Sequence, residues 1–189
     1  MRASGSAVPV RGFDAADPAN QLAADVAFYL MKTPRQLPSR YLYDALGSSL
    51  FDAICHLPWY RITRAETAML ARYGADILAA VHPLTRIVEL GSGNGEKLAT
   101  LLGSGPPTGP PVQVHLVDVS RIALDTAARA VGILPGVTVV AHQARYEDGL
   151  EAAVGNRPRG LRTFALFLGS NIGNFDPPAA EALLRRIAG

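Results

Sequence analysis

Hydrophobic and polar positions divide the chain into a helical first part and an alternating second part. In residues 65–81 apolar side chains recur every three or four positions, which predicts an amphipathic helix. Prolines bound two more predicted helices, one from residue 17 toward residue 31 and one over residues 44–56. Helical segments also separate four short runs of β-branched residues, and this alternation is typical of an α/β fold with a parallel sheet. The predicted strands lie near residues 86–90, 112–118, 137–142 and 163–169.

This pattern predicts three segments. We expect residues 1–16 to be disordered, residues 17–82 to form a helical N-terminal region and residues 83–189 to form a Rossmann-like ligand-binding domain. The first twenty residues contain no long apolar run, so we expect neither a secretory signal nor a membrane span. The expected location is therefore the cytoplasm.

The most informative stretch is the glycine-rich segment 87–97, IVELGSGNGEK. A short apolar strand contains an acid, Glu89, near its end, and three glycines then follow at every second position. Glycine allows a sharp backbone turn and lets a ligand lie against the main chain. Helix-forming residues resume at Lys97, so the unit is strand, loop and helix, the first unit of a nucleotide-binding α/β fold.

The loop discriminates among the ligands of such folds. A dinucleotide fingerprint needs a third glycine where this chain has Glu96, whose carboxylate would repel a pyrophosphate. A Walker loop needs Ser or Thr after Lys97, and Leu98 stands there. S-adenosylmethionine remains, because it has no phosphates and its charged ends could face Glu89 and Lys97. A tight turn without a ligand stays open, as does a nicotinamide-dependent oxidoreductase, which Glu96 disfavours.

The second predicted strand ends in another acid, Asp118, which lies 25 residues after Gly93. A carboxylate at this place can accept hydrogen bonds from both hydroxyls of an adenosine ribose. We expect Ser120 to cap the helix that follows. An ordinary loop acid is the alternative interpretation of Asp118.

Composition mainly excludes other functions. The net charge of +2 is too small and too dispersed to indicate nucleic-acid binding. The single cysteine, Cys55, cannot form an internal disulfide, and its apolar neighbours predict a buried, inert thiol. No spacing of Cys and His residues suggests a metal site, so we expect no metal.

Three separated motifs resemble those of the histidine-specific, S-adenosylmethionine-dependent methyltransferases, whose type member makes trimethylhistidine for ergothioneine. They are residues 41–52 with 57–66 (YLYDALGSSLFD and LPWYRITRAE), the loop 91–97, and residues 166–175 (LFLGSNIGNF). The motifs follow the family's order but cover only the first part of the family's length. The resemblance implies a class I methyltransferase fold. It further implies S-adenosylmethionine as methyl donor and methylation of the α-amino group of an amino acid, L-histidine.

The resemblance also implies roles for individual residues. It assigns substrate contacts to Gly169 and both substrate contacts and catalysis to Tyr60 and Asn174. An ordinary core position for Tyr146 and a loop position for Asn174 are the alternatives. The residues that would hold the cofactor, with Tyr146 stacking on adenine, are Tyr43, Gly91, Gly93, Lys97, Asp118 and Tyr146.

The chain also departs from the family. Arg61 and Ile62 stand where the family has tyrosine and proline, and Arg145 stands where an acid would bind the adenine amino group. A complete family sheet has more strands than the four expected here, so we expect the domain at 83–189 to be truncated at its C-terminus. The expected partners are an amino-acid substrate and a complementary C-terminal polypeptide, with no nucleic acid and no membrane. The alternative function is an inactive remnant, or one part of a split methyltransferase, that still binds cofactor.

Overall fold

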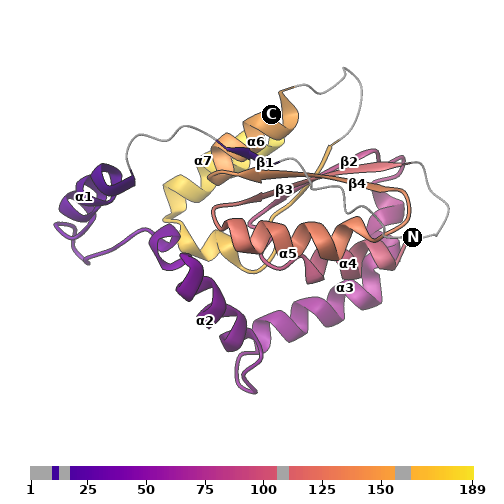
Figure 1. Ribbon diagram of the computed structural model, residues 1–189, viewed down its shortest axis with the longest axis horizontal. Coiled ribbons are helices and arrows are strands. Elements are labelled where there is room, and N and C mark those ends of the chain that lie inside the picture. Colours follow the sequence, from indigo (N-terminus) through magenta and orange to yellow (C-terminus); the bar gives the residue numbers. More distant parts are fainter. Residues whose placement is uncertain (1–9, 13–17, 106–110, 156–162) are drawn as a thin grey trace, which may run out of the picture.

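A computed structural model of the chain describes residues 10–12, 18–105, 111–155 and 163–189. Its centre is a five-stranded sheet with the order β1-β4-β3-β2-β5, in which every neighbouring pair is parallel (Figure 1). The carboxyl ends of the strands therefore lie along one edge, and the predicted α/β, Rossmann-like fold is confirmed. The four predicted strands are β2 (Arg86–Leu90), β3 (Val112–Asp118), β4 (Val137–Gln143) and β5 (Thr163–Leu166).

The fifth strand, β1 (Val10–Gly12), corrects the prediction for the N-terminal segment. We expected residues 1–16 to be disordered, but Val10 pairs with Ala141 and Gly12 with Gln143 on β4. An edge strand offers main-chain donors and acceptors to any extended segment, and three residues are too short to show an alternating pattern. Residues 1–9 and 13–16 lie outside the described residues.

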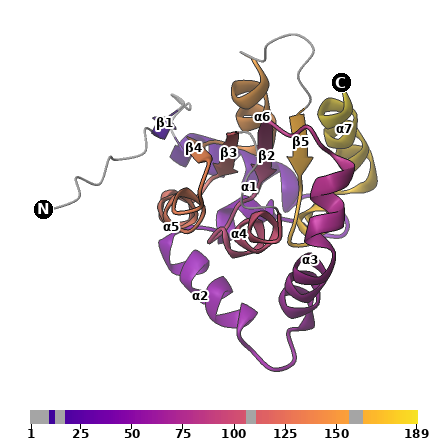
Figure 2. The same cartoon turned by 90° about the vertical axis from the view of Figure 1, so that its right-hand side faces the viewer.

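Helices cover both faces of the sheet (Figure 2). On one face lie α4 (Glu96–Gly103) and α5 (Arg121–Gly132), and on the other lies α6 (Tyr146–Val154). Successive residues of β2 consequently enter different clusters, Ile87 with the first pair of helices and Val88 with α6. Strands buried on both faces carry near-continuous apolar runs, which is how the sequence revealed them. The last helix, α7 (Pro177–Ala188), lies beside β5.

The helical N-terminal region consists of α1 (Pro18–Tyr29), a short 3₁₀ helix (Ser39–Leu42), α2 (Ala45–Cys55) and α3 (Arg61–Ala80). Figure 1 shows α1 apart from the sheet, whereas α3 packs along α4. The helix predicted for 65–81 begins four residues earlier, because its polar first turn hid the start of the apolar period. In the described part of the chain, every helix is too short or too polar to cross a membrane.

The fourth predicted strand ends early. We expected it to run to Gly169, but β5 stops at Leu166. Gly169 and Ser170 then adopt positive φ angles of 82° and 59°, which reverse the chain before the 3₁₀ helix η2 (Asn171–Asn174). The turn directs residues after β5 across the carboxyl ends of the strands, where the candidate site lies.

Candidate active site

A cavity of about 1260 Å³ lies between the carboxyl ends of the strands and the helical N-terminal region. On one side of β2 lie β3 and then β4, and on its other side lies β5. The strand order therefore reverses at β2, and folds of this kind bind ligands at such a switch point. The cavity brings together every residue to which the sequence assigned a site role. These residues are Tyr43, Tyr60, Gly91, Gly93, Lys97, Asp118, Tyr146, Gly169 and Asn174.

The three loop glycines all have positive φ angles, but they serve different purposes. A side chain on Gly95 would come within 2.7 Å of the Cα atom of Ala127, so this glycine allows α4 to approach α5. A side chain on Gly91 would come within 2.6 Å of the Asn171 amide. Gly93 faces open space, with nothing within 4 Å of an added Cβ atom. Gly93 is therefore the glycine that leaves room for a ligand.

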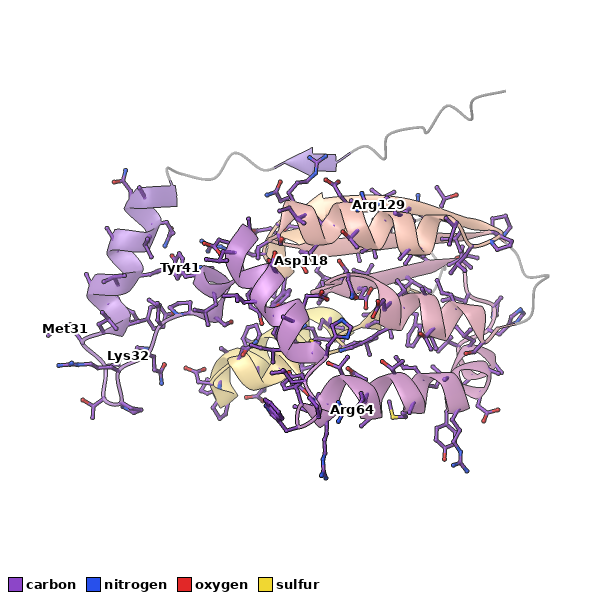
Figure 3. The ribbon with its side chains drawn as sticks, turned by 60° about the horizontal axis from the view of Figure 1, so that its bottom comes forward. Met31, Lys32, Tyr41, Arg64, Asp118 and Arg129 are labelled. Atoms are coloured by element: carbon purple, nitrogen blue, oxygen red, sulfur yellow. The ribbon has the colours of Figure 1, made fainter. Side chains whose placement is uncertain are left out.

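Asp118 both shapes the loop and faces the cavity. Its Oδ2 atom accepts a hydrogen bond from the Gly93 N–H at 3.0 Å, and its Oδ1 atom accepts one from the Ser120 N–H at 2.9 Å. Figure 3 shows Asp118 between α2 and the strand ends. Burial raises the pKa of Asp118, and the backbone hydrogen bonds from Ser120, Gly93 and Val119 oppose this rise. A carboxylate has about four acceptor sites, so these bonds leave acceptor capacity for a ligand hydroxyl. Ser120 caps α5, as predicted.

Glu89 is a buried acid at the cavity wall, with an exposed fraction of only 2%. Among the described residues, its Oε2 atom has no hydrogen-bond partner. Burial raises the pKa of Glu89 to about 8, while Lys97 lowers it and Asp118 and Glu66 raise it further. A buried carboxyl group of this kind gains from a cationic ligand that stabilises its charged form.

Lys97 is held by a residue to which the sequence assigned no role. Its Nζ atom lies 2.5 Å from Oε2 of Glu66 on α3. Glu66 also accepts the Gly169 N–H, at 2.9 Å to Oε1 and 3.0 Å to Oε2. Gly169 lies 103 residues away in the sequence, so no local spacing indicated this contact.

Aromatic residues line the side of the cavity formed by the N-terminal region. Phe51 contacts Tyr43 and Tyr60 edge to face, at ring-centroid distances of 5.8 Å and 6.3 Å. Burial raises the pKa of both tyrosines, so their hydroxyl groups remain protonated at neutral pH. A side-chain hydrogen bond with Asn174 partly offsets the rise for Tyr43. That contact joins a predicted cofactor residue to a predicted substrate residue.

Tyr146 belongs to an aromatic cluster and also reaches the glycine loop. Its ring lies 5.1 Å from Phe167 and 5.8 Å from Phe175, and burial raises its pKa. Its hydroxyl would lie 3.3 Å from a Cβ atom on Gly91. Adenine stacking by Tyr146 therefore stays a prediction. Arg145, the N-cap of α6, also lines the cavity.

One smaller expectation needs correction. Cys55 was expected to be buried, but it is partly exposed at the cavity wall because α2 lies over the opening rather than in the core. In the turn after β5, left-handed backbone is adopted by Gly169 and Ser170. Within the described ranges, no three His, Cys, Asp or Glu side chains cluster as metal ligands.

Comparison with known proteins identifies the family. Residues 22–189 match the family model of the histidine-specific, S-adenosylmethionine-dependent methyltransferases. The chain belongs to this family. It is 38% identical over 169 residues to a histidine N-alpha-methyltransferase of Mycobacterium tuberculosis, covering 89% of this chain and 51% of that protein. It is 40% identical over 167 residues to the enzyme of the same name from Mycolicibacterium smegmatis, covering 87% and 50%.

A further relative is ergothioneine biosynthesis protein 1 of Neurospora crassa, which is 30% identical over 152 residues. That match covers 80% of this chain and 17% of the relative. The chain thus spans about half the length of the two bacterial methyltransferases that it matches. All three sequence motifs that carried the resemblance fall inside the matched residues.

The buried acid makes stability depend on pH. The pKa of Glu89 is about 8 in the folded chain against an ordinary value of 4.5, so the folded state binds more protons between these limits. The free energy of unfolding should therefore fall as pH rises from 5 to 8, by at most about 1.4 kcal/mol per pH unit. Glu89→Gln should flatten this slope in urea unfolding at several pH values.

The exposed Glu181, which pairs with Arg185 on α7, offers a matched control. Glu181→Gln should leave the slope as in the unmodified chain. An unchanged slope in Glu89→Gln would show that Glu89 is not the group that titrates.

Proposed function

We propose that the chain binds S-adenosylmethionine in this cavity and methylates the α-amino group of L-histidine, forming trimethylhistidine for an ergothioneine-type pathway. One observation carries the proposal: a single cavity is lined by the glycine loop, Asp118, Lys97, Tyr60 and Asn174, which come from separate parts of the sequence. Two relatives named histidine N-alpha-methyltransferase support histidine as the substrate. The Neurospora relative's name supports the pathway.

The lining of the cavity fits S-adenosylmethionine group by group. Asp118 has acceptor sites for the ribose hydroxyls, and Gly93 leaves open space beside it. Lys97 offers an ammonium group to the carboxylate of the methionine part. The buried carboxyl group of Glu89, whose Oε2 atom lacks a partner in the described part of the chain, suits the neighbouring positive charges of that ligand.

The same loop argues against a dinucleotide cofactor. In the Rossmann fold a pyrophosphate binds at the N-terminus of the helix after the glycine loop, where main-chain N–H groups attract anions. Here α4 begins with Glu96, which places a carboxylate in that first turn. Charge repulsion therefore favours a ligand without phosphates over a nicotinamide dinucleotide.

Bound S-adenosylmethionine would supply an activated methyl group: the amine lone pair would form the new N–C bond as the C–S bond breaks and S-adenosylhomocysteine leaves. Each ammonium ion so formed would release a proton to solvent before the next transfer. The chain's own residues must orient an uncharged amine and exclude water. The Asn174 amide oxygen can accept a hydrogen bond from that amine without adding charge, and the protonated Tyr60 hydroxyl offers a second polar contact.

Cofactor binding should depend on Asp118. Asp118→Ala removes the acceptors for the ribose hydroxyls and should weaken S-adenosylhomocysteine binding by about 1.5–3 kcal/mol, the range for hydrogen bonds to a charged group. Isothermal titration calorimetry measures this loss. Asp125→Ala, at an exposed site on α5 paired with Arg121, is the control and should bind normally. Equal affinity of Asp118→Ala and the unmodified chain would remove Asp118 from the site.

Product formation should depend on Asn174. Mass spectrometry should detect methylated histidine when the chain is incubated with S-adenosylmethionine, L-histidine and the complementary C-terminal polypeptide that we propose as its partner. Asn174→Ala should lower the rate by about 100-fold, the cost of a misplaced reacting group, while affinity for S-adenosylhomocysteine changes little. Nα-acetylhistidine is the substrate control and should give no product, because its α-nitrogen is an amide. Methylation of the acetylated substrate would place the reaction on the imidazole ring and contradict the proposal.

A further inference from the structure

Glu66 is the residue of this site that the proposed function leaves without a role. We propose that Glu66 is a positioning residue: its carboxylate fixes Lys97 and the Gly169 turn so that Lys97 is preset to receive the carboxylate of S-adenosylmethionine. This inference rests on the proposed function, because it concerns how the same cofactor is bound. It adds a residue that itself does not line the cavity.

The contacts of Glu66 join three elements at one point. Glu66 is on α3, Lys97 is in the first turn of α4, and Gly169 begins the turn after β5. One carboxylate binds the Lys97 ammonium group at 2.5 Å and the Gly169 N–H at 2.9 Å and 3.0 Å. Helix α3, which carries Glu66, begins directly after Tyr60. Glu66 therefore also connects the helix next to a proposed substrate residue with Lys97, a proposed cofactor residue.

Burial distinguishes this contact from an ordinary surface ion pair. The side chains of Lys97 and Glu66 are 21% and 18% exposed, whereas the Arg185 and Glu181 pair on α7 is 77% and 62% exposed. Exposed pairs hold their partners weakly because water screens the charges and both side chains remain mobile. A partly buried carboxylate that accepts from two donors restricts both of them.

The turn after β5 needs such support. Ser170 has a φ angle of 59°, a conformation that residues other than glycine adopt only when their surroundings hold them there. Gly169, which precedes it, also has a positive φ angle, and a side chain on it would lie 3.1 Å from the Lys97 ammonium group. Glu66 therefore anchors the backbone that carries Asn174 in addition to the lysine.

Two opposite effects of Glu66 on ligand binding must be compared. Its negative charge reduces the pull of Lys97 on a ligand carboxylate, but its contact removes the rotamer freedom that a lysine would otherwise lose on binding. A lysine loses more side-chain entropy on ordering than almost any other residue, while charge pairing in partly exposed sites is screened. Since an ammonium group has three N–H donors, Lys97 can bind Glu66 and a ligand at once. Glu66 should therefore strengthen binding.

The test compares two ligands that differ in the group Lys97 would bind. S-adenosylhomocysteine carries the amino-acid carboxylate, and 5′-methylthioadenosine has the same adenosine and thioether without it. Glu66→Gln keeps the size and an acceptor for the Gly169 N–H but removes the charge that holds Lys97. Calorimetry on the full chain should show about tenfold weaker S-adenosylhomocysteine binding, the scale of one freed lysine side chain, and unchanged 5′-methylthioadenosine binding.

A double-mutant cycle with Lys97→Met tests whether Glu66 affects ligand binding through Lys97. Once Lys97 is replaced, Glu66→Gln should cause no further loss of S-adenosylhomocysteine affinity. Glu66→Asp, which keeps the charge but shortens the side chain, is the second variant and should show the same ligand-selective loss. Glu181→Gln is the control for charge removal at an exposed site and should bind both ligands normally.

Three results would overturn the inference. Equal weakening of both ligands would mean a general structural role, tighter S-adenosylhomocysteine binding would mean that Glu66 competes with the ligand, and unchanged binding would mean no role. A different result concerns the proposed function itself: if the unmodified chain binds neither ligand, the cofactor assignment is wrong and this inference is wrong with it.

Discussion

The burial of Glu89 at the end of β2 is the constraint on which the site depends. The sheet is covered on both faces, so the side chain of Glu89 on β2 is buried and its carboxylate loses most of its hydration. Lys97 is the cation that opposes the resulting rise in pKa, while Asp118 and Glu66 add to it. Lys97 therefore does not neutralise all the carboxyl groups around Glu89. A ligand with positive charges at sulfur and nitrogen relieves that imbalance, which is the physical basis for selecting S-adenosylmethionine.

The second determinant of the site is the way the N-terminal region closes it. The sheet alone would present the glycine loop and Asp118 to solvent. The helical region adds Tyr43 and Tyr60 from the opposite side, and Asn174 reaches Tyr43 from the turn after β5. Glu66 links α3 of the N-terminal region to α4, the helix after the glycine loop, through its ion pair with Lys97. The residues proposed to bind cofactor and substrate therefore form one connected network, which suits a reaction whose main requirement is to place an amine against a methyl group.

Local patterns in the sequence predicted much of this arrangement. The apolar run of β2 and the glycines after it are contiguous, so the strand and the loop could be predicted from a single segment. The place of Asp118 at the end of β3 could be predicted for the same reason. The contact of Glu66 with Gly169 was not predictable, since it joins residues 103 positions apart that meet only once the sheet has formed. The hydrogen bond from the Gly93 N–H to Asp118 and the pairing of β1 with β4 were missed for the same physical reason. The ring of Tyr146 lies in an aromatic cluster at the cavity wall, and its stacking on adenine stays a prediction.

In the proposed complex, one cavity at the carboxyl ends of the strands binds S-adenosylmethionine with its ribose at Asp118 and its carboxylate at Lys97. A crystal structure of the chain with S-adenosylhomocysteine is the decisive measurement. We expect ribose hydroxyls within hydrogen-bonding distance of the Asp118 carboxylate, the ligand chain passing over Gly93, and the ligand carboxylate at the Lys97 ammonium group while Glu66 keeps its contact with Lys97. A ligand bound elsewhere, or bound in the cavity without contact to Asp118 and Lys97, would show that this binding mode is wrong.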